Sequence, residues 1–212
     1  MKDIVILGSS GFGTEVLWLL EDNNQRKKEW NILGFIDDFS DSSEILGYPV
    51  LGNDEWLLKY ERPVNAVCAF GNPALRCKVA EKFLNRAKYI TFPNLISRAA
   101  VVSKHTIMGQ GNIICANSAI SPTACLHNFV ISNLSCTVGH NVVISNFATL
   151  NPGSSVSGNV MIGEGCEIGT GTHIIQGVRI GPYTVTGAGS TIIRDTPGYC
   201  TVVGVPGRVL EK

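Results

Sequence analysis

One repeat constrains the fold of this 212-residue chain more than any other feature. Reading every sixth residue from Ile96 to Ile192 gives seventeen positions, of which fifteen are aliphatic; only Ser132 and Thr186 are not. A period of six fits neither the 3.6-residue period of a helix nor the two-residue alternation of a half-buried strand. Such fixed self-similarity is typical of stacked repeats, in which each unit buries its apolar side chain against its neighbours.

The columns beside the aliphatic one agree with this interpretation. Residues directly after each aliphatic position are mostly small or turn-forming, and we expect them at corners that need a positive φ or a tight turn. Residues four positions after it are small or β-branched, with Asn112 as the one exception. We therefore predict a parallel β-helix of the hexapeptide type, in which three hexads close one coil and seventeen hexads give between five and six coils. A β-sandwich with chance spacing is excluded because the phase never slips, and no large loop is expected between coils.

The first 92 residues follow a different pattern. Apolar runs at residues 3–7, 32–36, 64–70 and 89–92 predict four short strands, and helical patterns follow the first and the third of them. Strands that alternate with helices predict a small parallel α/β unit. We therefore divide the chain into an α/β domain over residues 1–92 and a β-helix domain with a C-terminal tail over residues 93–212.

Composition limits the classes of partner. Lys and Arg number 17 and so do Asp and Glu, so the net charge is zero and nothing favours nucleic acid. Only 16% of residues are charged, which predicts that much surface is covered inside the repeat or by other subunits. No apolar run reaches about 18 residues and no signal peptide is recognisable, so we expect a cytoplasmic protein without membrane insertion. The seven cysteines form no Cys-x-x-Cys pair and are expected to be reduced.

Several motifs occur in a fixed order along nearly the whole chain. They are Ile6–Gly13, Gly34–Asp38, Phe70–Asn72 with Arg76, Asn133 seven residues before His140, Gly158–Gly163 and Val203–Arg208. In these motifs the chain resembles the sugar O/N-acyltransferases of the sialic acid O-acetyltransferase and bacillosamine N-acetyltransferase type, which are hexapeptide-repeat transferases. The resemblance implies a left-handed β-helix, a homotrimer with active sites between subunits, acetyl-CoA as co-substrate and a place in cell-surface polysaccharide biosynthesis.

The candidate catalytic group is His140 with Asn141, Asn133 and Gly158. Acyl transfer from a thioester needs a base for the proton of the attacking amine or hydroxyl, and histidine suits that task. His140 stands two residues after an aliphatic position, so it should project outward near a corner. The family usually carries an acidic residue where this chain has Asn141, and an amide cannot stabilise an imidazolium as a carboxylate does. The resemblance assigns the backbone N–H of Gly158 to the oxyanion.

The resemblance also assigns a groove for acetyl-CoA. The matching positions are Thr149, Gly158, Thr170, Ala188 and Arg208. Thr149 replaces a second family histidine, and Thr170 and Ala188 stand between glycines that leave room for a pantetheine arm. Arg208 lies in the C-terminal segment and could meet a phosphate of coenzyme A.

A nucleotide sugar is expected in the α/β domain. The candidate residues are Gly8, Ser9, Ser10, Gly11, Phe12, Gly13, Asp37, Asp38, Gly71, Asn72 and Arg76. The glycine-rich loop lies between a strand and a helix, where backbone N–H groups bind phosphate. Its spacing is Gly-x-x-Gly-x-Gly, so the signal is weaker than the dinucleotide fingerprint. Asp37 and Asp38 end the second strand, at the carboxyl edge where ligands collect.

Together these features predict an acetyl-CoA-dependent acetyltransferase, most readily an N-acetyltransferase of a nucleotide-linked 4-amino sugar. Two alternatives stay open: an O-acetyltransferase of sialic acid or another sugar, and a non-catalytic trimer that binds sugar nucleotides. Zinc chemistry of the carbonic anhydrase kind is not expected, because the four histidines are widely spaced and include no His-x4-His pair.

Overall fold

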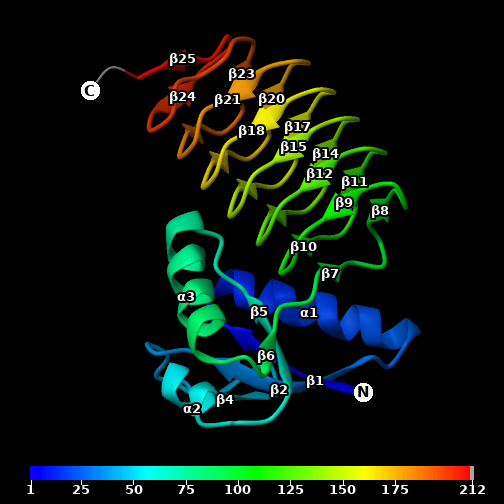
Figure 1. Cartoon of the computed structure of the whole chain (residues 1–212), viewed down its shortest axis with the longest axis vertical. Coiled ribbons are helices and arrows are strands. Elements are labelled where there is room, and N and C mark those ends of the chain that lie inside the picture. The colour runs from blue at the N-terminus through cyan, green and yellow to red at the C-terminus, as the bar shows by residue number, and fades with distance from the viewer. Residues whose placement is uncertain (211–212) are drawn as a thin grey trace.

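The chain folds into an α/β unit and a β-helix that rises from it (Figure 1). A computed structural model describes residues 1–210. The helices are α1 (Gly11–Arg26), α2 (Asp54–Leu58) and α3 (Pro73–Arg86). The strands of the α/β unit are β1 (Lys2–Leu7), β2 (Trp30–Ile36), β3 (Glu44–Ile45), β4 (Tyr48–Gly52), β5 (Val64–Cys68) and β6 (Ile90–Thr91). Within residues 1–210, none of the helices combines the length and apolar character needed to span a membrane.

The α/β unit is one sheet in the order β3-β4-β2-β1-β5-β6. All neighbouring strands run parallel except β3, which is antiparallel to β4. The four predicted strands correspond to β1, β2, β5 and β6, and the two predicted helices to α1 and α3. The sequence did not indicate β3, β4 and α2, because Gly47 and Pro49 interrupt runs too short to show a period.

The β-helix has three faces, each a parallel sheet of two-residue strands. The first face contains β7 (Leu95–Ile96), β10 (Ile113–Ile114), β13 (Ile131–Ser132), β16 (Thr149–Leu150), β19 (Glu167–Ile168) and β22 (Val185–Thr186), extended by β24 (Thr201–Val203) and β25 (Arg208–Val209). The second face contains β8 (Val101–Val102), β11 (Ala119–Ile120), β14 (Thr137–Val138), β17 (Ser155–Val156), β20 (His173–Ile174) and β23 (Thr191–Ile192). The third face contains β9 (Ile107–Met108), β12 (Cys125–Leu126), β15 (Val143–Ile144), β18 (Met161–Ile162) and β21 (Arg179–Ile180).

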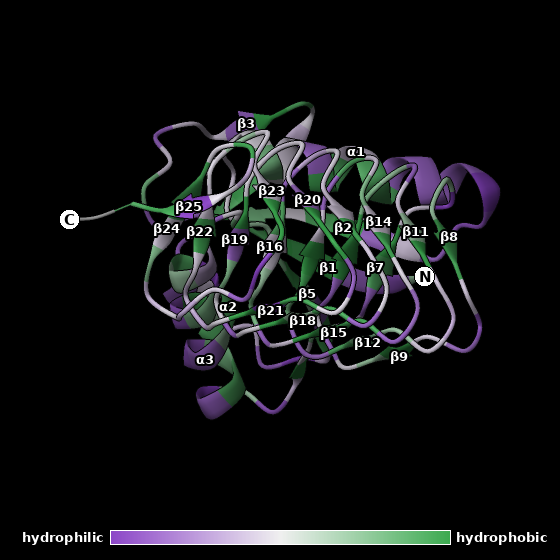
Figure 2. Ribbon diagram, turned by 90° about the horizontal axis from the view of Figure 1, so that it is seen from above, coloured by the Kyte–Doolittle hydropathy of each residue, from purple (hydrophilic) through white to green (hydrophobic). Residues whose placement is uncertain are grey.

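Register in the β-helix confirms the predicted period. Ile120 pairs with Val138 and Val138 with Val156, so each residue lies over the one eighteen positions earlier. The fold is a left-handed parallel β-helix whose aliphatic column fills the interior, from Ile114 to Ile192 in one buried cluster. Figure 2 shows the apolar strands inside and the polar ends of α1 and α3 outside. In each two-residue strand the second residue lies in the apolar interior, so a large share of the β-helix carries no charge.

The polar interruptions of the interior are satisfied by hydrogen bonds. Buried Thr186 faces Thr172 with 3.0 Å between their hydroxyls and accepts the N–H of Gly169. Buried Asn112, the exception in its column, accepts the N–H of Val130 at 2.7 Å through its side-chain oxygen. In both cases a side-chain oxygen accepts a backbone N–H in place of a carbonyl. The polar residues are therefore satisfied, and the eighteen-residue register continues past them.

The positive-φ turns lie in a different column from the one that the sequence suggested. They occur three residues after each hexad position from Met108 to Thr186, not directly after it. The fourteen consecutive members are Gly111, Asn117, Thr123, Phe129, Ser135, Asn141, Phe147, Gly153, Asn159, Gly165, Gly171, Gly177, Tyr183 and Gly189. In the column directly after the aliphatic residue, glycine allows the backbones of neighbouring coils to lie close together. A Cβ on Gly169 would lie 2.3 Å from the carbonyl oxygen of Thr186.

Arg76 joins the α/β unit to the β-helix. Its fully buried guanidinium donates to the carbonyls of Phe70 and Gly71 on one side and of Phe129 and Phe147 on the other, at 2.6–3.0 Å. None of the salt bridges within the described chain involves this cation, and burial lowers the pKa of Arg76 to about 10. The rings of Phe129 and Phe147 stack with centroids 5.2 Å apart beside the same junction.

Two sequence-based assignments are corrected by this junction. Arg76 was expected to meet a nucleotide sugar, but its side chain is 0% exposed and its donors are committed to protein oxygens. Thr149 was expected at the acetyl-CoA groove, but it is 1% exposed, and its hydroxyl donates to Gly71 at 2.8 Å and accepts from Arg76. Both errors arise because burial between two domains is not visible in local sequence.

Replacing Arg76 with Met should lower the free energy of unfolding by about 3 kcal/mol or more, because several buried carbonyls lose their donor at about 1–3 kcal/mol each. Arg76→Lys should recover little, since one ammonium cannot span both sets of carbonyls. Denaturant unfolding at fixed protein concentration measures the effect. Lys78→Met, an exposed position on the same helix, is the control. An Arg76→Met loss no larger than that of the control contradicts the assigned role.

Candidate functional site

His140 lies on the edge between the second and third faces, just after β14, and its side chain is exposed as the hexad phase predicts. Gly158 occupies the same place one coil later, after β17. A Cβ on Gly158 would lie only 2.6 Å from both Cε1 and Nε2 of His140, so the imidazole rests directly against this glycine. A residue with any side chain here would push the ring away.

The backbone N–H of Gly158 is an open donor beside the imidazole. Among residues 1–210 it has no hydrogen-bond acceptor, whereas the next N–H, of Asn159, donates to the His140 carbonyl at 2.9 Å. The Gly158 carbonyl accepts from Gly177 at 3.0 Å, which ties this residue to the next coil. The edge therefore places an imidazole and an unused backbone N–H next to each other, and acyl transfer needs a proton acceptor and an oxyanion donor in such an arrangement.

Asn141 and Asn133 have different relations to His140. Asn141 has a φ of 57°, and its side-chain nitrogen lies 3.3 Å from Nδ1 of His140, so it contacts the imidazole directly. Asn133 lies on the edge between the first and second faces, where its side-chain oxygen accepts the N–H of Leu134 at 2.7 Å. One chain therefore brings His140, Asn141 and Gly158 together but leaves Asn133 on another edge.

Thr170 and Ala188 also lie on the edge between the first and second faces. They are exposed and stand one above the other on consecutive coils, and Gly189 donates to the Thr170 carbonyl at 2.8 Å. Their own N–H groups have no acceptor within residues 1–210. Arg208 is exposed on β25, and the turn before it contacts the same end of the β-helix through the bond from Gly207 to Thr191.

The glycine-rich loop connects β1 to α1 in a shape that only glycine permits at two points. Gly8 has a φ of 96°, and a Cβ on Gly13 would lie 2.3 Å from the Gly8 carbonyl oxygen. Ser10 is the N-cap of α1 but makes no side-chain cap bond, so the first N–H groups of this 16-residue helix face outward without a side-chain partner. Phe12 is half-buried in the cluster below α1 and does not extend the loop's polar surface.

Asp37 holds the loop. Its carboxylate accepts the N–H of Ser9 at 2.8 Å, the Ser9 hydroxyl at 2.6 Å and the N–H of Phe39 at 2.9 Å. Burial by itself would raise the pKa of Asp37, but these bonds prevail and hold it below its ordinary value. Asp38 instead accepts the N–H of Asp54 at 2.8 Å. Both carboxylates therefore organise backbone at the carboxyl edge of the sheet.

Gly71 and Asn72 have structural partners at this edge. Asn72 caps α3 by accepting the N–H of Leu75 at 2.9 Å, and Pro73 begins the helix. The Gly71 carbonyl accepts from Arg76 and Thr149. Of the residues predicted to bind the nucleotide sugar, the loop and the two carboxylates thus share one edge, while Arg76 faces the β-helix.

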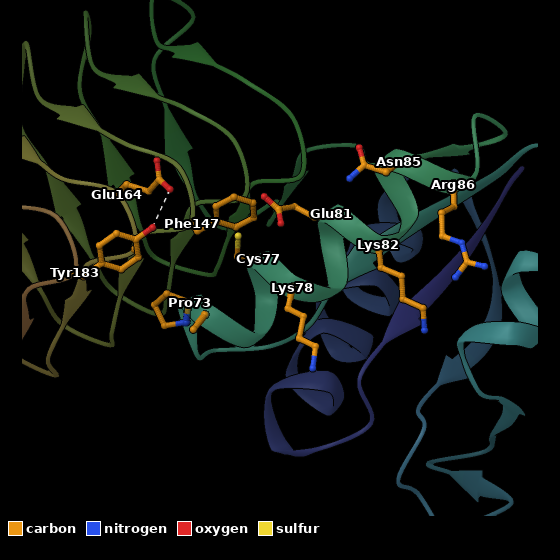
Figure 3. Close-up of a pocket in the computed structure, with 12 residues that line it drawn as sticks. Pro73, Cys77, Lys78, Glu81, Lys82, Asn85, Arg86, Phe147, Glu164 and Tyr183 are labelled. Atoms are coloured by element: carbon orange, nitrogen blue, oxygen red, sulfur yellow. Dashed lines mark hydrogen bonds between the residues drawn. The ribbon is translucent and has the colours of Figure 1, made fainter. Parts of the chain in front are cut away.

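Two cavities of the described chain lie between the α/β unit and the β-helix, away from His140. One, of about 550 Å³, lies between α3 and the edge where the third face meets the first; Figure 3 shows Cys77 and Glu81 on the side of α3 that faces Phe147, Glu164 and Tyr183. Tyr183 donates to Glu164 at 3.0 Å there. No motif in the sequence predicted this groove, and its wall includes two aromatic residues of the turn column, Phe147 and Tyr183.

The second cavity, of about 320 Å³, lies between α1 and the first coils. Trp18 and Leu19 of α1 form one wall, and Ala116 and Leu134 of the edge between the first and second faces form the other. This cavity runs along α1, which begins at the glycine-rich loop, and its lining includes Leu134, the residue after Asn133.

The buried cysteines are not activated nucleophiles. All seven are free. Burial raises the pKa of Cys68 and of Cys115 to about 12 and that of Cys166 to about 11. Such thiols stay protonated near neutral pH and behave as small apolar groups. Within residues 1–210 no cluster of three His, Cys, Asp or Glu side chains is placed to hold a metal ion.

Comparison with known proteins gives the class and then the family. Residues 3–83 match the PglD N-terminal domain, and residues 159–194 match the bacterial transferase hexapeptide repeat (six repeats). The protein is therefore an acyltransferase of the hexapeptide-repeat class. No protein of curated function matches the sequence significantly.

Solved structures resemble the chain over its whole length. The acetyltransferase domain of PglB from Neisseria gonorrhoeae is 31% identical, with a TM-score of 0.91 over 99% of this chain and 100% of that one. A histidine-to-asparagine variant of perosamine N-acetyltransferase from Caulobacter crescentus, solved with CoA and GDP-perosamine, is 27% identical, with a TM-score of 0.91 over 100% and 98%. WeeI from Acinetobacter baumannii is 27% identical, with a TM-score of 0.88 over 99% and 100%. The chain belongs to the family of sugar acetyltransferases that includes PglB, as its motifs predicted.

Changing Gly158 to Ala should lower kcat by about 100-fold, the scale expected when one preorganised oxyanion donor is displaced, because the new methyl group forces His140 off its position. Steady-state assays of CoA release measure the effect, and thermal unfolding verifies that the protein is folded. Ser157→Ala, which removes a neighbouring hydroxyl and adds no atom beside the ring, is the control. Activity of Gly158→Ala within about twofold of the control would be inconsistent with this geometry.

Proposed function

We propose that this protein transfers the acetyl group of acetyl-CoA to the 4-amino group of a nucleotide-linked sugar, with His140 as general base. The observation that carries the proposal is the contact of the His140 imidazole with Gly158, whose unpaired N–H lies at the same edge. Relatives support the substrate classes: the Caulobacter enzyme was solved with CoA and GDP-perosamine, and the PglB domain also with acetyl coenzyme A. A cytoplasmic location is part of the proposal.

The reaction proceeds by direct attack. The sugar amine attacks the thioester carbonyl, and Nε2 of His140 takes the amine proton as the carbon–nitrogen bond forms. The N–H of Gly158 donates to the oxygen that becomes negative. Collapse of the tetrahedral adduct breaks the carbon–sulfur bond, and the imidazolium returns its proton to the departing thiolate. An acyl-enzyme is not needed, since the buried cysteines with raised pKa are protonated.

The α/β unit supplies the nucleotide-sugar site. The N-terminus of α1 favours negative charge, and its backbone N–H groups suit a phosphate. Asp37 keeps the Ser9 segment of the loop in place through two hydrogen bonds to that residue. The cavity along α1 extends from Glu15, one turn after the loop, to Leu134 of the β-helix, and we assign it to the sugar.

A homotrimer completes the site. His140 and Gly158 lie on the edge between the second and third faces, whereas Thr170 and Ala188 lie on the edge between the first and second. These two edges are separated by the width of the second face. That width is the length of one hexad of extended chain, up to about 20 Å. A threefold arrangement places one edge of each copy against the other edge of the next and closes this gap.

His140→Ala should lower kcat by about 10²–10⁴-fold on the best acceptor, because the proton-transfer partner is lost. His127→Ala is the matched control, an exposed histidine on the edge where the third face meets the first. A panel of nucleotide-linked 4-amino sugars, free amino sugars and sialic acid, read by thiol release, identifies the acceptor. Preference for sialic acid would overturn the acceptor class, and an unchanged His140→Ala rate would overturn the mechanism in favour of a binding role.

Mixing two inactive variants tests the shared site. Coexpression of His140→Ala with Ala188→Arg, which blocks the coenzyme groove, should restore about a quarter of wild-type activity, because each mixed trimer contains one interface with both edges intact. Each variant alone should be inactive. Size-exclusion chromatography with light scattering confirms that mixed trimers form. No recovery in such trimers would mean that each site is built within one chain.

A further inference from the structure

Three side chains form a ladder beside His140, one on each of three consecutive coils. They are Thr123, Asn141 and Asn159, which share the positive-φ turn position on the edge between the second and third faces. The Thr123 hydroxyl donates to the side-chain oxygen of Asn141 at 2.6 Å. The Asn141 side-chain nitrogen donates to the Asn159 oxygen at 3.1 Å and lies 3.3 Å from Nδ1 of His140.

The direction of this ladder determines which ring nitrogen holds the proton. A neutral imidazole has one N–H, so a ring nitrogen that accepts a hydrogen bond must be the unprotonated one. With the Asn141 amide nitrogen toward Nδ1, the proton resides on Nε2, and Nε2 has no lone pair for a substrate. With the Asn141 oxygen toward Nδ1, the proton resides on Nδ1, and Nε2 is free to act as a base.

The reversed ladder keeps its hydrogen bonds. Turning the Asn141 amide by 180° directs its nitrogen to the Thr123 oxygen, and the Thr123 hydroxyl then donates to the Pro122 carbonyl, which is already 2.5 Å away. Asn159 is exposed and can present its nitrogen to the Asn141 oxygen. The backbone N–H of Asn141 donates to Thr123 at 3.1 Å in either direction. The two directions therefore have similar numbers of hydrogen bonds and similar energies. A carboxylate at position 141 would allow only one of them, because both of its oxygens are acceptors.

We propose that the Thr123–Asn141–Asn159 ladder is a positioning device that selects the tautomer of His140, and that the direction with the Asn141 oxygen on Nδ1 is the reactive one. The inference rests on the proposed role of His140 as general base. In the reactive direction Nε2 takes the proton of the attacking amine while Nδ1–H donates to Asn141. The same proton leaves Nε2 for the coenzyme A thiolate when the carbon–sulfur bond breaks.

Two carboxylate variants test the proposal because they add the same charge one coil apart and require opposite tautomers. Asn141→Asp presents only acceptors to Nδ1 and should favour the Nδ1–H form. Asn159→Asp accepts only from the Asn141 nitrogen, so it keeps that nitrogen beside Nδ1 and should favour the Nε2–H form. Imidazole ¹⁵N chemical shifts of the intact protein report the tautomer directly, and the spectrum of His140→Gln assigns the His140 signals.

We expect Asn141→Asp to raise kcat and Asn159→Asp to lower it about tenfold, with KM for the acceptor nearly unchanged, because only the reactive fraction of enzyme changes. Tautomer shifts in the same direction, or no shifts, would overturn the ladder, since charge alone acts alike in both variants. Opposite shifts with equal kcat values would overturn the assignment of the reactive direction. Full activity of His140→Ala would instead refute the proposed function and leave the tautomer result standing.

Discussion

Hydrogen bonds between coils, with a register of eighteen residues, are the constraint on which the other features depend. Each coil pairs with the next without a register shift, from Leu95 with Ile113 to His173 with Thr191. A side chain on an edge therefore always lies next to the residue eighteen positions away. This rule places His140 on Gly158, and it stacks Phe129 with Phe147. A site on such a scaffold is rigid because moving one residue would require moving a coil.

The junction with the α/β unit is a second constraint and has a different physical character. A buried cation without a carboxylate is costly, and it is tolerated because its donors reach carbonyls in both parts of the chain. Arg76 ties the loop that ends β5 to the turns of Phe129 and Phe147, so the carboxyl edge of the sheet has a set orientation toward the coils. The glycine-rich loop and the β-helix are thus held at a set orientation without sharing a residue.

The candidate site combines both constraints. The coils place His140 against Gly158, the proposed base and oxyanion donor, on one edge and open N–H groups on another, and the α/β unit supplies a helix N-terminus with a carboxylate-held loop. Asn141 replaces the acid that the family usually has, and the stacking of the coils gives this amide two neighbours of its own. A carboxylate at this position would favour one tautomer of the imidazole. In the proposed ladder, the Asn141 amide can face the ring in two directions, each of which favours a different tautomer.

The amino-acid sequence by itself determined the β-helix, its period, the α/β unit before it and the family. These depend on local patterns along the chain. An apolar residue at every sixth position, for example, can be recognised without knowing what it contacts. Sequence also located His140 at an exposed corner, since position within the hexad sets direction. Only the tertiary structure decided the roles of Arg76 and Thr149, the turn column with its aromatic residues, and the pairing of Thr123, Asn141 and Asn159. The roles of these residues depend on contacts with residues one coil or one domain away. No local sequence pattern shows such contacts.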